Sequence, residues 1–564
     1  MRSSLWARAS LRHSAQGRLS LVLQLEGLQR ASGAQPRVIP IYICDAEREI
    51  ESLRRAILER HQVNWDSQAA EFGVPWDSAW SAVPPLLTAP ISCEELVLPM
   101  NPNQWLARFG RFLVVAFAVL LFGASASAEW KEKVLYSFQG GSDGQTPAGG
   151  VAFDKAGNIY GVTHEGGSTC PSPGCGTIFQ LSPGKGGAWT ETLLYGFNGT
   201  QGSYPEGSVI IDAHGNLYGT TSIGGNGQCK LFGYVVGCGV VYELSPPTQK
   251  SGQWSYAVLY SFQGGNDGLF PVGDLVFDKQ GNLYGATWYG GGKGTTCDQY
   301  YGGNCGTVFK LSPPKQKGRA WAEKILHSFA GGTAGKQFGD GAQPNGGLVL
   351  DSQGAIYGTT YFGGNEAGGC DGGSGGTGCG VVFKLAPPTK KGGAWSEQVL
   401  HRFVGPDGAS PAAGVILDRS GNLYGTAFSG GNNGNGSVFE LRKLTGGSGT
   451  WREKALYLFN DGNDGSGPMG SLLFGAHGDL YGTTAVATNR NAQGNVFRMK
   501  PPFGNAGAWD FSVLHTFAGT PDGAYAAANL VCGADGGLFG STQQGGTGTD
   551  CAYGGCGTVF EVSP

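Results

Sequence analysis

From Trp130 to Pro564, hydrophobic and polar positions follow one pattern that recurs seven times. Each copy holds four short blocks rich in aromatic and β-branched residues, separated by Gly, Asp and Pro. In the third copy the blocks are 254–262, 273–278, 282–287 and 306–311. Such blocks predict β-strands, so each copy predicts a four-stranded unit. A repeat of about 60 residues with this content predicts a propeller or a solenoid.

The two ends of the array predict how it closes. It begins with a block of the first kind, 130–138, and ends with a block of the last kind, 557–562. Pairing these two blocks would complete the last unit and close a seven-bladed all-β propeller with few exposed strand edges. An open solenoid is the alternative, and it would need polar caps at both ends.

A D-x2-G-N segment separates the second and third blocks. Asp can hydrogen-bond the backbone of its own turn and Gly accepts a positive φ, so these aspartates are predicted to form hairpin turns rather than to bind ligands. They are Asp154, Asp212, Asp278, Asp351 and Asp418, replaced by Gly475 and Gly533 in the last two copies.

One position inside the third block is Gly in every copy. A strand-interior Gly indicates close approach of another group, and we expect the Trp that opens each repeat to pack there. The seven residues are Gly161, Gly219, Gly285, Gly358, Gly425, Gly482 and Gly540.

Residues 1–99 contain no copy of the repeat, and a secretory pattern follows them. After Met100 come two arginines, the apolar run 112–122 and an Ala-Ser-Ala cleavage site at 126–128. This order predicts a signal peptide at 100–128 and a mature propeller at 129–564, and the run is short for a membrane span of about 20 residues. Residues 1–99 are then an upstream extension from a mis-called start, without a native fold. The alternative is a genuine cytoplasmic segment with a signal anchor, in which 45–61 could form an amphipathic helix.

Ten of the 13 cysteines form five close pairs between the third and fourth blocks. Members of a pair are present or absent together, which predicts disulfides in a secreted or periplasmic protein. Each pair is expected to staple a Gly-rich loop outside the strands. Metal binding is the alternative, but the spacing is not C-x2-C and no His accompanies each pair. Cys532 is predicted to be a buried free thiol. The pairs are Cys170/Cys175, Cys229/Cys238, Cys297/Cys305, Cys370/Cys379 and Cys551/Cys556.

Charge and composition narrow the choice of partners. The formal net charge is −4 and no basic tract is present, so a nucleic-acid partner is not expected. The 102 glycines show no three-residue period, which excludes collagen. We expect a monomer with an extracellular ligand and no membrane association once the signal peptide is removed.

The segments L-Y-S-F-x-G-G-x-D-G, G-N-L-Y-G-T-T and C-G-T-V-F-x-L-S-P resemble the GloVer tandem repeat of bacterial extracellular proteins. The resemblance spans 130–564. It implies export and a β fold built of repeats, and it implies no established activity.

The first candidate site is a set of D-G-x2-P loops, which lead from the first block of one repeat to the next block. If their carboxylates ringed the channel mouth, they could hold Ca²⁺ or a cationic ligand; no other metal or cofactor is predicted. The alternative is turn chemistry. The aspartates are Asp143, Asp267, Asp340, Asp407, Asp464 and, in a partial copy, Asp522.

The second candidate is an aromatic group in the third copy, Trp288, Tyr289, Tyr300 and Tyr301. Exposed aromatic rings suit sugar stacking, although the same side chains could pack under their own loop. No catalytic constellation is recognisable: no G-x-S-x-G stands in a suitable context, and His164 in a candidate loop has no assignable partner. The sequence therefore predicts a secreted binding or scaffold module for a glycan, peptide or surface partner. The alternative is an extracellular carbohydrate-active lyase or hydrolase.

Overall fold

The chain divides into two compact units, Met1–Ala128 and Glu129–Pro564, and each is described by itself. In the first unit of this computed structural model, β1 (Trp6–His13) and β2 (Leu19–Glu26) form an antiparallel hairpin. The predicted signal peptide and the rest of the predicted extension lie outside the described residues. In the second unit the structure describes residues 130–564 except 232, 250–251, 293–296, 298–303, 317, 332–338, 365–369, 373–375, 445–449, 461–462, 487–492, 503–506 and 552–553.

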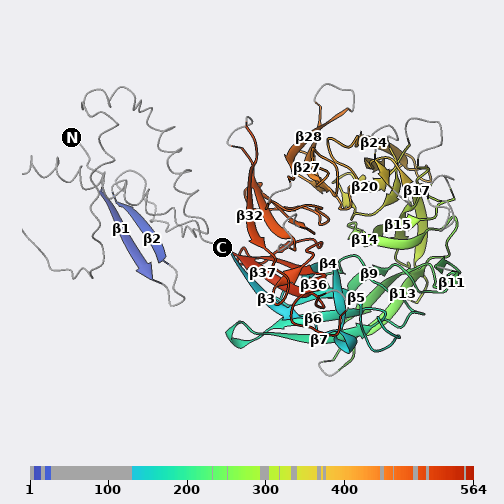
Figure 1. Ribbon diagram of the computed structural model, residues 1–564, viewed down its shortest axis with the longest axis horizontal. Coiled ribbons are helices and arrows are strands. Elements are labelled where there is room, and N and C mark those ends of the chain that lie inside the picture. Colours follow the sequence, from blue (N-terminus) through green and yellow to red (C-terminus); the bar gives the residue numbers. More distant parts are fainter. Residues whose placement is uncertain are drawn as a thin grey trace, which may run out of the picture. The chain divides into compact units, whose positions relative to one another are not determined.

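Seven antiparallel sheets, here called blades 1 to 7, surround a common axis in the second unit (Figure 1). Each is given from the innermost to the outermost strand. Blade 1 is β4 (Gln145–Phe153), β5 (Ile159–Glu165), β6 (Thr177–Pro183) and β7 (Trp189–Gly196). Blade 2 is β8 (Ile210–Ile211), β9 (Leu217–Thr221), β12 (Val240–Ser245) and β13 (Ser255–Ser261). Blade 3 is β14 (Leu269–Phe277), β15 (Leu283–Tyr289), β16 (Thr307–Ser312) and β17 (Ala322–Ser328). Blade 4 has a divided inner strand, β18 (Ala342–Pro344) and β19 (Val349–Leu350), followed by β20 (Ile356–Phe362), β23 (Val381–Ala386) and β24 (Ser396–Arg402).

The remaining three blades repeat this order. Blade 5 is β25 (Ile416–Leu417), β26 (Leu423–Ala427), β27 (Ser437–Lys443) and β28 (Trp451–Leu458). Blade 6 is β29 (Leu473–Phe474), β30 (Leu480–Thr484), β31 (Asn495–Lys500) and β32 (Asp510–Thr516). Blade 7 is β34 (Val531–Cys532), β35 (Leu538–Thr542), β37 (Thr558–Ser563) and β3 (Lys131–Ser137). Short pairs in the loops are β10 (Lys230–Leu231) with β11 (Tyr234–Val235), β21 (Asp371–Gly372) with β22 (Gly376–Thr377), and β33 (Gly523–Ala524) with β36 (Gln544–Gly545).

Helices are a minor feature of the propeller. The 3-10 turns η4 (Gly141–Asp143) and η5 (Lys185–Gly187) are three residues each. In the described parts of the chain, no helix combines the length and the hydropathy that a membrane span needs.

Ring closure occurs as predicted. Strand β3 pairs antiparallel with β37, from Lys131 opposite Ser563 to Ser137 opposite Thr558. The first strand of the array is therefore the outermost strand of the last blade, and the seven-bladed propeller is confirmed over the open solenoid.

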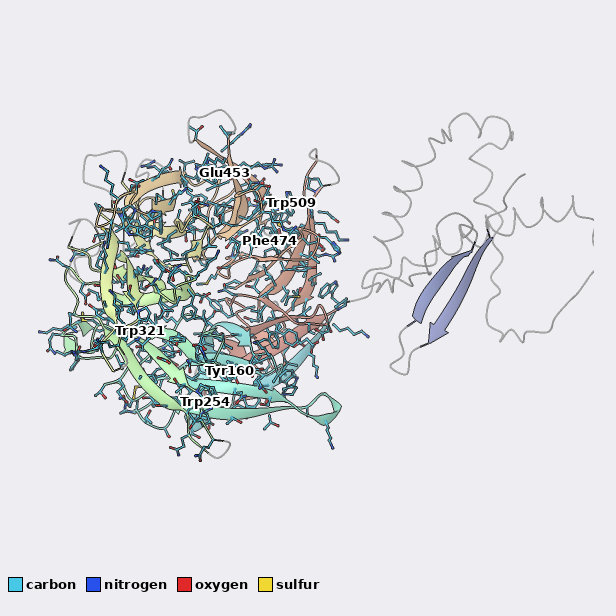
Figure 2. The ribbon with its side chains drawn as sticks, turned by 180° about the vertical axis from the view of Figure 1, so that it is seen from behind. Tyr160, Trp254, Trp321, Glu453, Phe474 and Trp509 are labelled. Carbon is cyan, nitrogen blue, oxygen red and sulfur yellow. A yellow bond between two sulfur atoms is a disulfide. The ribbon has the colours of Figure 1, made fainter. Side chains whose placement is uncertain are left out.

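The hydrophobic core lies between neighbouring blades. One cluster of buried residues, for example, joins Tyr284 and Val308 of blade 3 to Ile356 and Phe383 of blade 4. The Trp that opens a repeat packs across this boundary: Trp254 of blade 2 meets the Tyr160 ring of blade 1 at 6.1 Å (Figure 2). Burial of aromatic surface between blades is therefore the main force that holds the ring together.

The invariant glycine has a different partner from the one predicted. A Cβ atom built on Gly161 would lie 2.5 Å from Cζ of Phe179, its direct cross-strand neighbour on β6. In blade 2, Tyr242 takes the place of Phe, and its hydroxyl oxygen would lie 2.4 Å from a Cβ atom built on Gly219. The expectation that the repeat Trp packs there was wrong, because the aromatic residue of G-T-V-F covers the glycine within the same blade.

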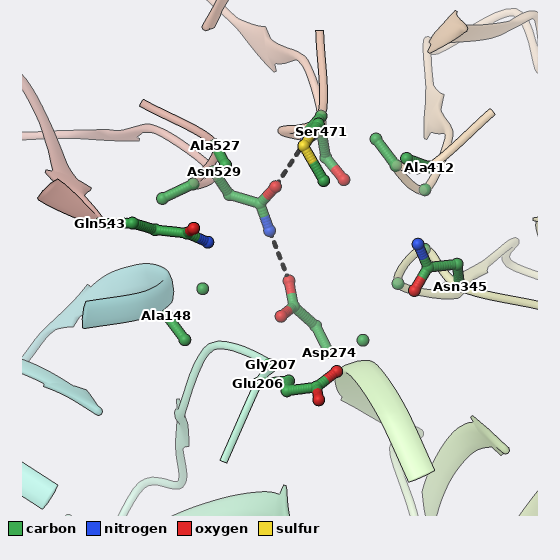
Figure 3. A pocket seen from close by; sticks show the side chains of 18 of the residues that line it. Ala148, Glu206, Gly207, Asp274, Asn345, Ala412, Ser471, Ala527, Asn529 and Gln543 are labelled. Carbon is green, nitrogen blue, oxygen red and sulfur yellow. Dashed lines mark hydrogen bonds between the residues drawn. The ribbon is translucent and has the colours of Figure 1, made fainter. Parts of the chain in front are cut away.

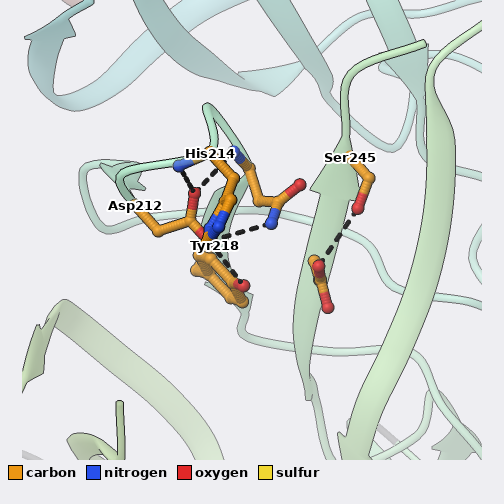
Figure 4. A network of polar contacts seen from close by, with 6 residues as sticks. Asp212, His214, Tyr218 and Ser245 are labelled. Atoms are coloured by element: carbon orange, nitrogen blue, oxygen red, sulfur yellow. Dashed lines mark hydrogen bonds and ion pairs between the residues drawn. The ribbon is translucent and has the colours of Figure 1, made fainter. Parts of the chain in front are cut away.

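The D-x2-G-N segments form hairpin turns, as predicted. In blade 2, Oδ1 of Asp212 accepts the backbone N–H groups of His214 at 2.8 Å and Asn216 at 3.0 Å. Its Oδ2 accepts the Asn216 side-chain amide at 2.8 Å and the Tyr218 hydroxyl at 3.3 Å (Figure 4). Both oxygens of this carboxylate already accept hydrogen bonds within the turn, so few positions are left for a ligand.

All five predicted disulfides are present, each inside one blade: Cys170–Cys175, Cys229–Cys238, Cys297–Cys305, Cys370–Cys379 and Cys551–Cys556. Cys532 is free, as predicted, but it is exposed rather than buried. It stands in the two-residue strand β34, where little of the chain covers it.

The second cysteine of each pair does more than the predicted stapling of a loop. It is buried and belongs to the hydrophobic core between blades, because it directly precedes the Gly that leads into the third strand of its blade. Its carbonyl also accepts a backbone N–H of the next blade, at 2.8 to 3.0 Å. The pairs lie in loops outside the strands, as predicted, and one end of each is in addition anchored in the core. These residues are Cys175, Cys238, Cys305, Cys379 and Cys556.

Candidate functional site

The six D-G aspartates lie beside the outer strands. The Tyr136 hydroxyl donates to Oδ1 of Asp143 at 2.8 Å, and the backbone N–H of Gln139 donates to Oδ2 at 2.7 Å. Each of the others is likewise paired with the Tyr or His of the preceding outer strand, at Asp267, Asp340, Asp407, Asp464 and Asp522. None of the six lines the axial pocket. The structure therefore gathers no ring of these carboxylates at the channel mouth.

The aromatic group of the third copy packs inward where it is described. Tyr289 is buried, and its ring lies 6.1 Å from Phe270 and 5.7 Å from Trp288. Trp288 packs against the hydrophobic core cluster that contains Tyr289 and Phe270. This arrangement favours packing over sugar stacking for these two side chains. Tyr300 and Tyr301 lie outside the described residues.

A pocket of about 370 Å³ lies on the propeller axis and receives residues from all seven blades (Figure 3). Most of its lining is Gly and Ala, so a few larger side chains determine its chemistry. Besides Asp274 and Asn529, the larger lining side chains include Thr146, His164, Glu206, Asn345, Met469 and Gln543.

Asp274 and Asn529, from blades 3 and 7, meet in the middle of the pocket (Figure 3). The Asn529 side-chain amide donates to Oδ2 of Asp274 at 2.7 Å, and the Ser208 backbone N–H donates to Oδ1 at 2.6 Å. Burial raises the pKa of Asp274, and these hydrogen bonds oppose the rise. The same repeat position is Gly150, Gly347 and Gly414 in three other blades. The bridge between Asp274 and Asn529 thus crosses the pocket from blade 3 to blade 7.

His164 has partners at the pocket mouth that its sequence context did not reveal. Its ring stacks on Tyr204 with centroids 4.7 Å apart, and its Nε2 lies 3.7 Å from Oε1 of Glu206. The His164 and Glu206 side chains remain 27% and 35% exposed, so a ligand can reach both. Because the partners belong to the next blade, no local spacing could have indicated them.

A second group of side chains lies at the same mouth. The Tyr525 hydroxyl is 3.6 Å from the sulfur of Met469, which lines the pocket. The pocket lining therefore supplies a carboxylate, a thioether and amide side chains, and the rings of Tyr204 and Tyr525 lie beside it.

Tyr204 and Tyr525 occupy one repeat position with an unusual backbone. Six non-Gly residues there have φ between 53° and 61°. In each copy the backbone N–H at this position donates to a carbonyl of the preceding blade, at 2.7 to 3.0 Å. The backbone conformation and its hydrogen bond recur in every copy, whereas the side chain differs from copy to copy. An alignment of the seven copies could have revealed this variation of the side chain. The residues are Thr146, Tyr204, Phe270, Gln343, Ser410, Gly467 and Tyr525.

Glutamates between neighbouring outer strands were also missed. Burial, followed by the Asp143 charge, raises the pKa of Glu191 on β7 to about 7. Glu323 has the same relation to Asp267 and also a pKa of about 7. The W-x-E spacing near the start of the outer strand, present in five of the seven copies, is the signal that could have identified them.

Comparison with known proteins identifies a family for the chain. The family model of the Gloeobacter/Verrucomicrobia repeat matches residues 121–297 and 370–564. No curated protein matches the chain. Similar solved structures include an oxidoreductase (glucose dehydrogenase) of Thermus thermophilus, 15% identical over 77% of this chain and 100% of that one, with a TM-score of 0.35. A family AA12 carbohydrate-active enzyme of Trichoderma reesei is 10% identical over 78% and 96%, with a TM-score of 0.35. The intramolecular trans-sialidase of Ruminococcus gnavus is 13% identical over 76% and 96%, also with a TM-score of 0.35. These likenesses carry no functional argument.

Proposed function

We propose that this chain, which belongs to the Gloeobacter/Verrucomicrobia repeat family, is an extracellular binding module that takes a glycan at the mouth of its axial pocket. The observation that carries this proposal is the stacked pair of His164 and Tyr204 beside the carboxylate of Glu206. The group breaks the regularity of the repeat at one point on the mouth, which suits a single asymmetric ligand.

The chemistry of the mouth fits a neutral, hydroxyl-rich ligand. An aromatic face such as Tyr204 can stack on the apolar side of a sugar ring, while carboxylate and amide groups accept and donate hydrogen bonds to hydroxyls. Glu206, Asn345 and Gln543 supply these groups around the same pocket. The five intrachain disulfides agree with an oxidising, extracellular location.

Binding is favoured over hydrolysis by the state of the two pocket carboxylates. Glycoside hydrolysis needs one carboxyl as acid and a second as nucleophile or base. Both oxygens of Asp274 already accept hydrogen bonds from the protein. Of these two carboxylates, Glu206 is then the one available to a ligand. The D-G aspartates could have held Ca²⁺ only if they ringed the channel mouth, and each is instead paired with a Tyr or His of the preceding outer strand.

The test is a glycan array with the labelled protein, followed by calorimetric titration of the glycans that bind. Glu206→Gln and Tyr204→Ala should each weaken binding by about tenfold or more, equivalent to about 1.4 kcal/mol. Glu243→Gln is the matched control, because Glu243 belongs to the same blade but does not line the pocket. Absence of binding to any glycan contradicts the proposal, and release of reducing sugar from a bound polysaccharide would replace it with the hydrolase alternative.

A further inference from the structure

Two groups of His, Asp and Glu lie between neighbouring outer strands, away from the axial pocket. Within each group one ligand atom per residue lies within 4.8 Å of the other two. In each, the His comes from one outer strand, the Asp from the loop that follows it, and the Glu from the outer strand of the next blade. The groups are His401–Asp407–Glu453 and His515–Asp522–Glu132.

The positions of imidazole and carboxylate suit coordination of one ion. Nε2 of His401 lies 2.9 Å from Oδ2 of Asp407, and the corresponding distance between His515 and Asp522 is 3.2 Å. Two ligand atoms on a tetrahedral ion with bonds of about 2.0–2.1 Å are about 3.3 Å apart. The Val404 backbone N–H holds the second oxygen of Asp407 at 2.8 Å, which fixes the orientation of this carboxylate.

The glutamates show that the charge of these groups is incompletely compensated. Oε1 of Glu453 and Oε1 of Glu132 are buried and have no hydrogen-bond partner among the described residues (Figure 2 labels Glu453). A buried carboxylate oxygen without a partner costs free energy, which a proton or a cation can recover. Each group thus places two carboxylates and one imidazole nitrogen around the same small space, and this nitrogen would release its proton when it binds an ion.

The other copies of the repeat act as internal comparisons. In blade 2, Tyr256 stands in place of the Glu, and the outer strand of the preceding blade has Tyr195 in place of the His. The two rings stack with their centroids 4.1 Å apart. A third His–Asp pair, His327 with Asp340 at 3.3 Å, has Glu397 nearby. There burial raises the pKa of Glu397, and the charge of His327, followed by that of Arg402, opposes the rise. These three side chains do not bring one ligand atom each within 4.8 Å of the others, so this copy is not included in the proposal.

We propose that the two groups each bind one Zn²⁺ or a similar divalent transition-metal ion through one imidazole and two carboxylates, with water completing the coordination. Imidazole favours such ions, whereas Ca²⁺ takes oxygen ligands only. Each ion would join the outer strands of adjacent blades. In the second group it would tie β3, the strand that closes the ring, to β32 of blade 6.

Metal content and titration of the tag-free full chain test this proposal. After treatment with EDTA and its removal, calorimetric titration with Zn²⁺ should show two tight sites, and Zn²⁺ should raise the unfolding temperature. His401→Gln and His515→Gln should each remove one equivalent, and the double variant both. Replacement by Co²⁺ should give the visible absorption of tetrahedral coordination, lost in the same variants.

His327→Gln and His214→Gln are the controls and should keep both equivalents. His214 is 86% exposed and reports adventitious binding at the surface. Circular dichroism of each variant distinguishes loss of a ligand from loss of the fold. A folded wild-type protein that binds no Zn²⁺, or whose stoichiometry is unchanged in the double variant, overturns the proposal and leaves these groups as hydrogen-bonded His–Asp pairs.

Discussion

At the residue scale, each blade uses its glycine and its carboxylates in fixed structural roles. Gly161 leaves room for Phe179, and Asp212 completes a hairpin turn. Glu191 is different, because burial beside Asp143 makes its charged form unfavourable. Single substitutions can therefore separate packing effects from electrostatic ones.

Gly161→Ala should destabilise the propeller by about 1–3 kcal/mol, because its new Cβ atom would overlap the Phe179 ring. Gly196→Ala is the matched control in the same blade. There the nearest atom to a new Cβ is a Thr169 carbon at 3.6 Å, an ordinary contact, and φ is not positive. Urea unfolding of both variants is the measurement. Equal stabilities would show that the tight approach of Phe179 is not a constraint.

Glu191→Gln should reduce the dependence of stability on pH. The Glu191 pKa is about 7 in the folded protein and its ordinary value is 4.5, so the folded state binds the proton more tightly. Its stabilising contribution is complete below pH 4.5 and is lost as the pH rises through 7. Between pH 4.5 and about 7, the free energy of unfolding of the wild type should therefore fall more than that of the variant. Urea unfolding at a series of pH values measures both. A parallel pH dependence in both proteins would contradict the raised pKa.

At the scale of elements, strands could be predicted from sequence far better than the contacts of their loops. Block 273–278 overlaps β14, which ends at Phe277 and starts earlier than predicted, at Leu269. The chain continues pairing with β15 across a register irregularity between Val272 and Val276. The partners of His164 could not be predicted, since the loops that meet at the mouth belong to different copies. The repeat Trp was assigned to the wrong position because composition does not reveal strand register.

The disulfide of blade 2 should restrain its loop more than its sheet. Cys229 and Cys238 close a loop that holds the hairpin of β10 and β11. Cys229→Ser combined with Cys238→Ala, which keeps the buried position apolar, should destabilise the protein by about 2–3 kcal/mol, because the crosslink limits the conformations of the unfolded chain. Hydrogen exchange should accelerate at 229–238 and stay unchanged in β9 and β12. Faster exchange throughout the blade would show that the crosslink also supports the strands.

At the scale of the whole molecule, the ring depends on one pairing between the ends of the array. Seven repeats and the offset of one strand at the ends made this closure predictable from the sequence. The hydrogen bond between Asp274 and Asn529 in the axial pocket was not predictable in the same way. The two residues lie 255 positions apart, and neither residue type recurs at this repeat position in another copy.

Deleting residues 130–138 should lower the unfolding temperature sharply and promote aggregation, because it removes β3 and exposes the edge of β37. Substituting Lys131 and Lys133 by Gln is a control that keeps the strand. A melting curve of the deletion variant that matched the wild type would contradict the role of β3 as the closing strand.

The same pairing has a consequence for synthesis. Strand β3 leaves the ribosome first among the propeller strands, and its partner β37 leaves last. Until then, β3 has no hydrogen-bonded strand partner, and blade 7 lacks the strand that joins β3 to the rest of its sheet. A chain cut short before β37 therefore cannot complete the ring, however well its first six blades form. The closed ring can therefore form only after β37 has been translated.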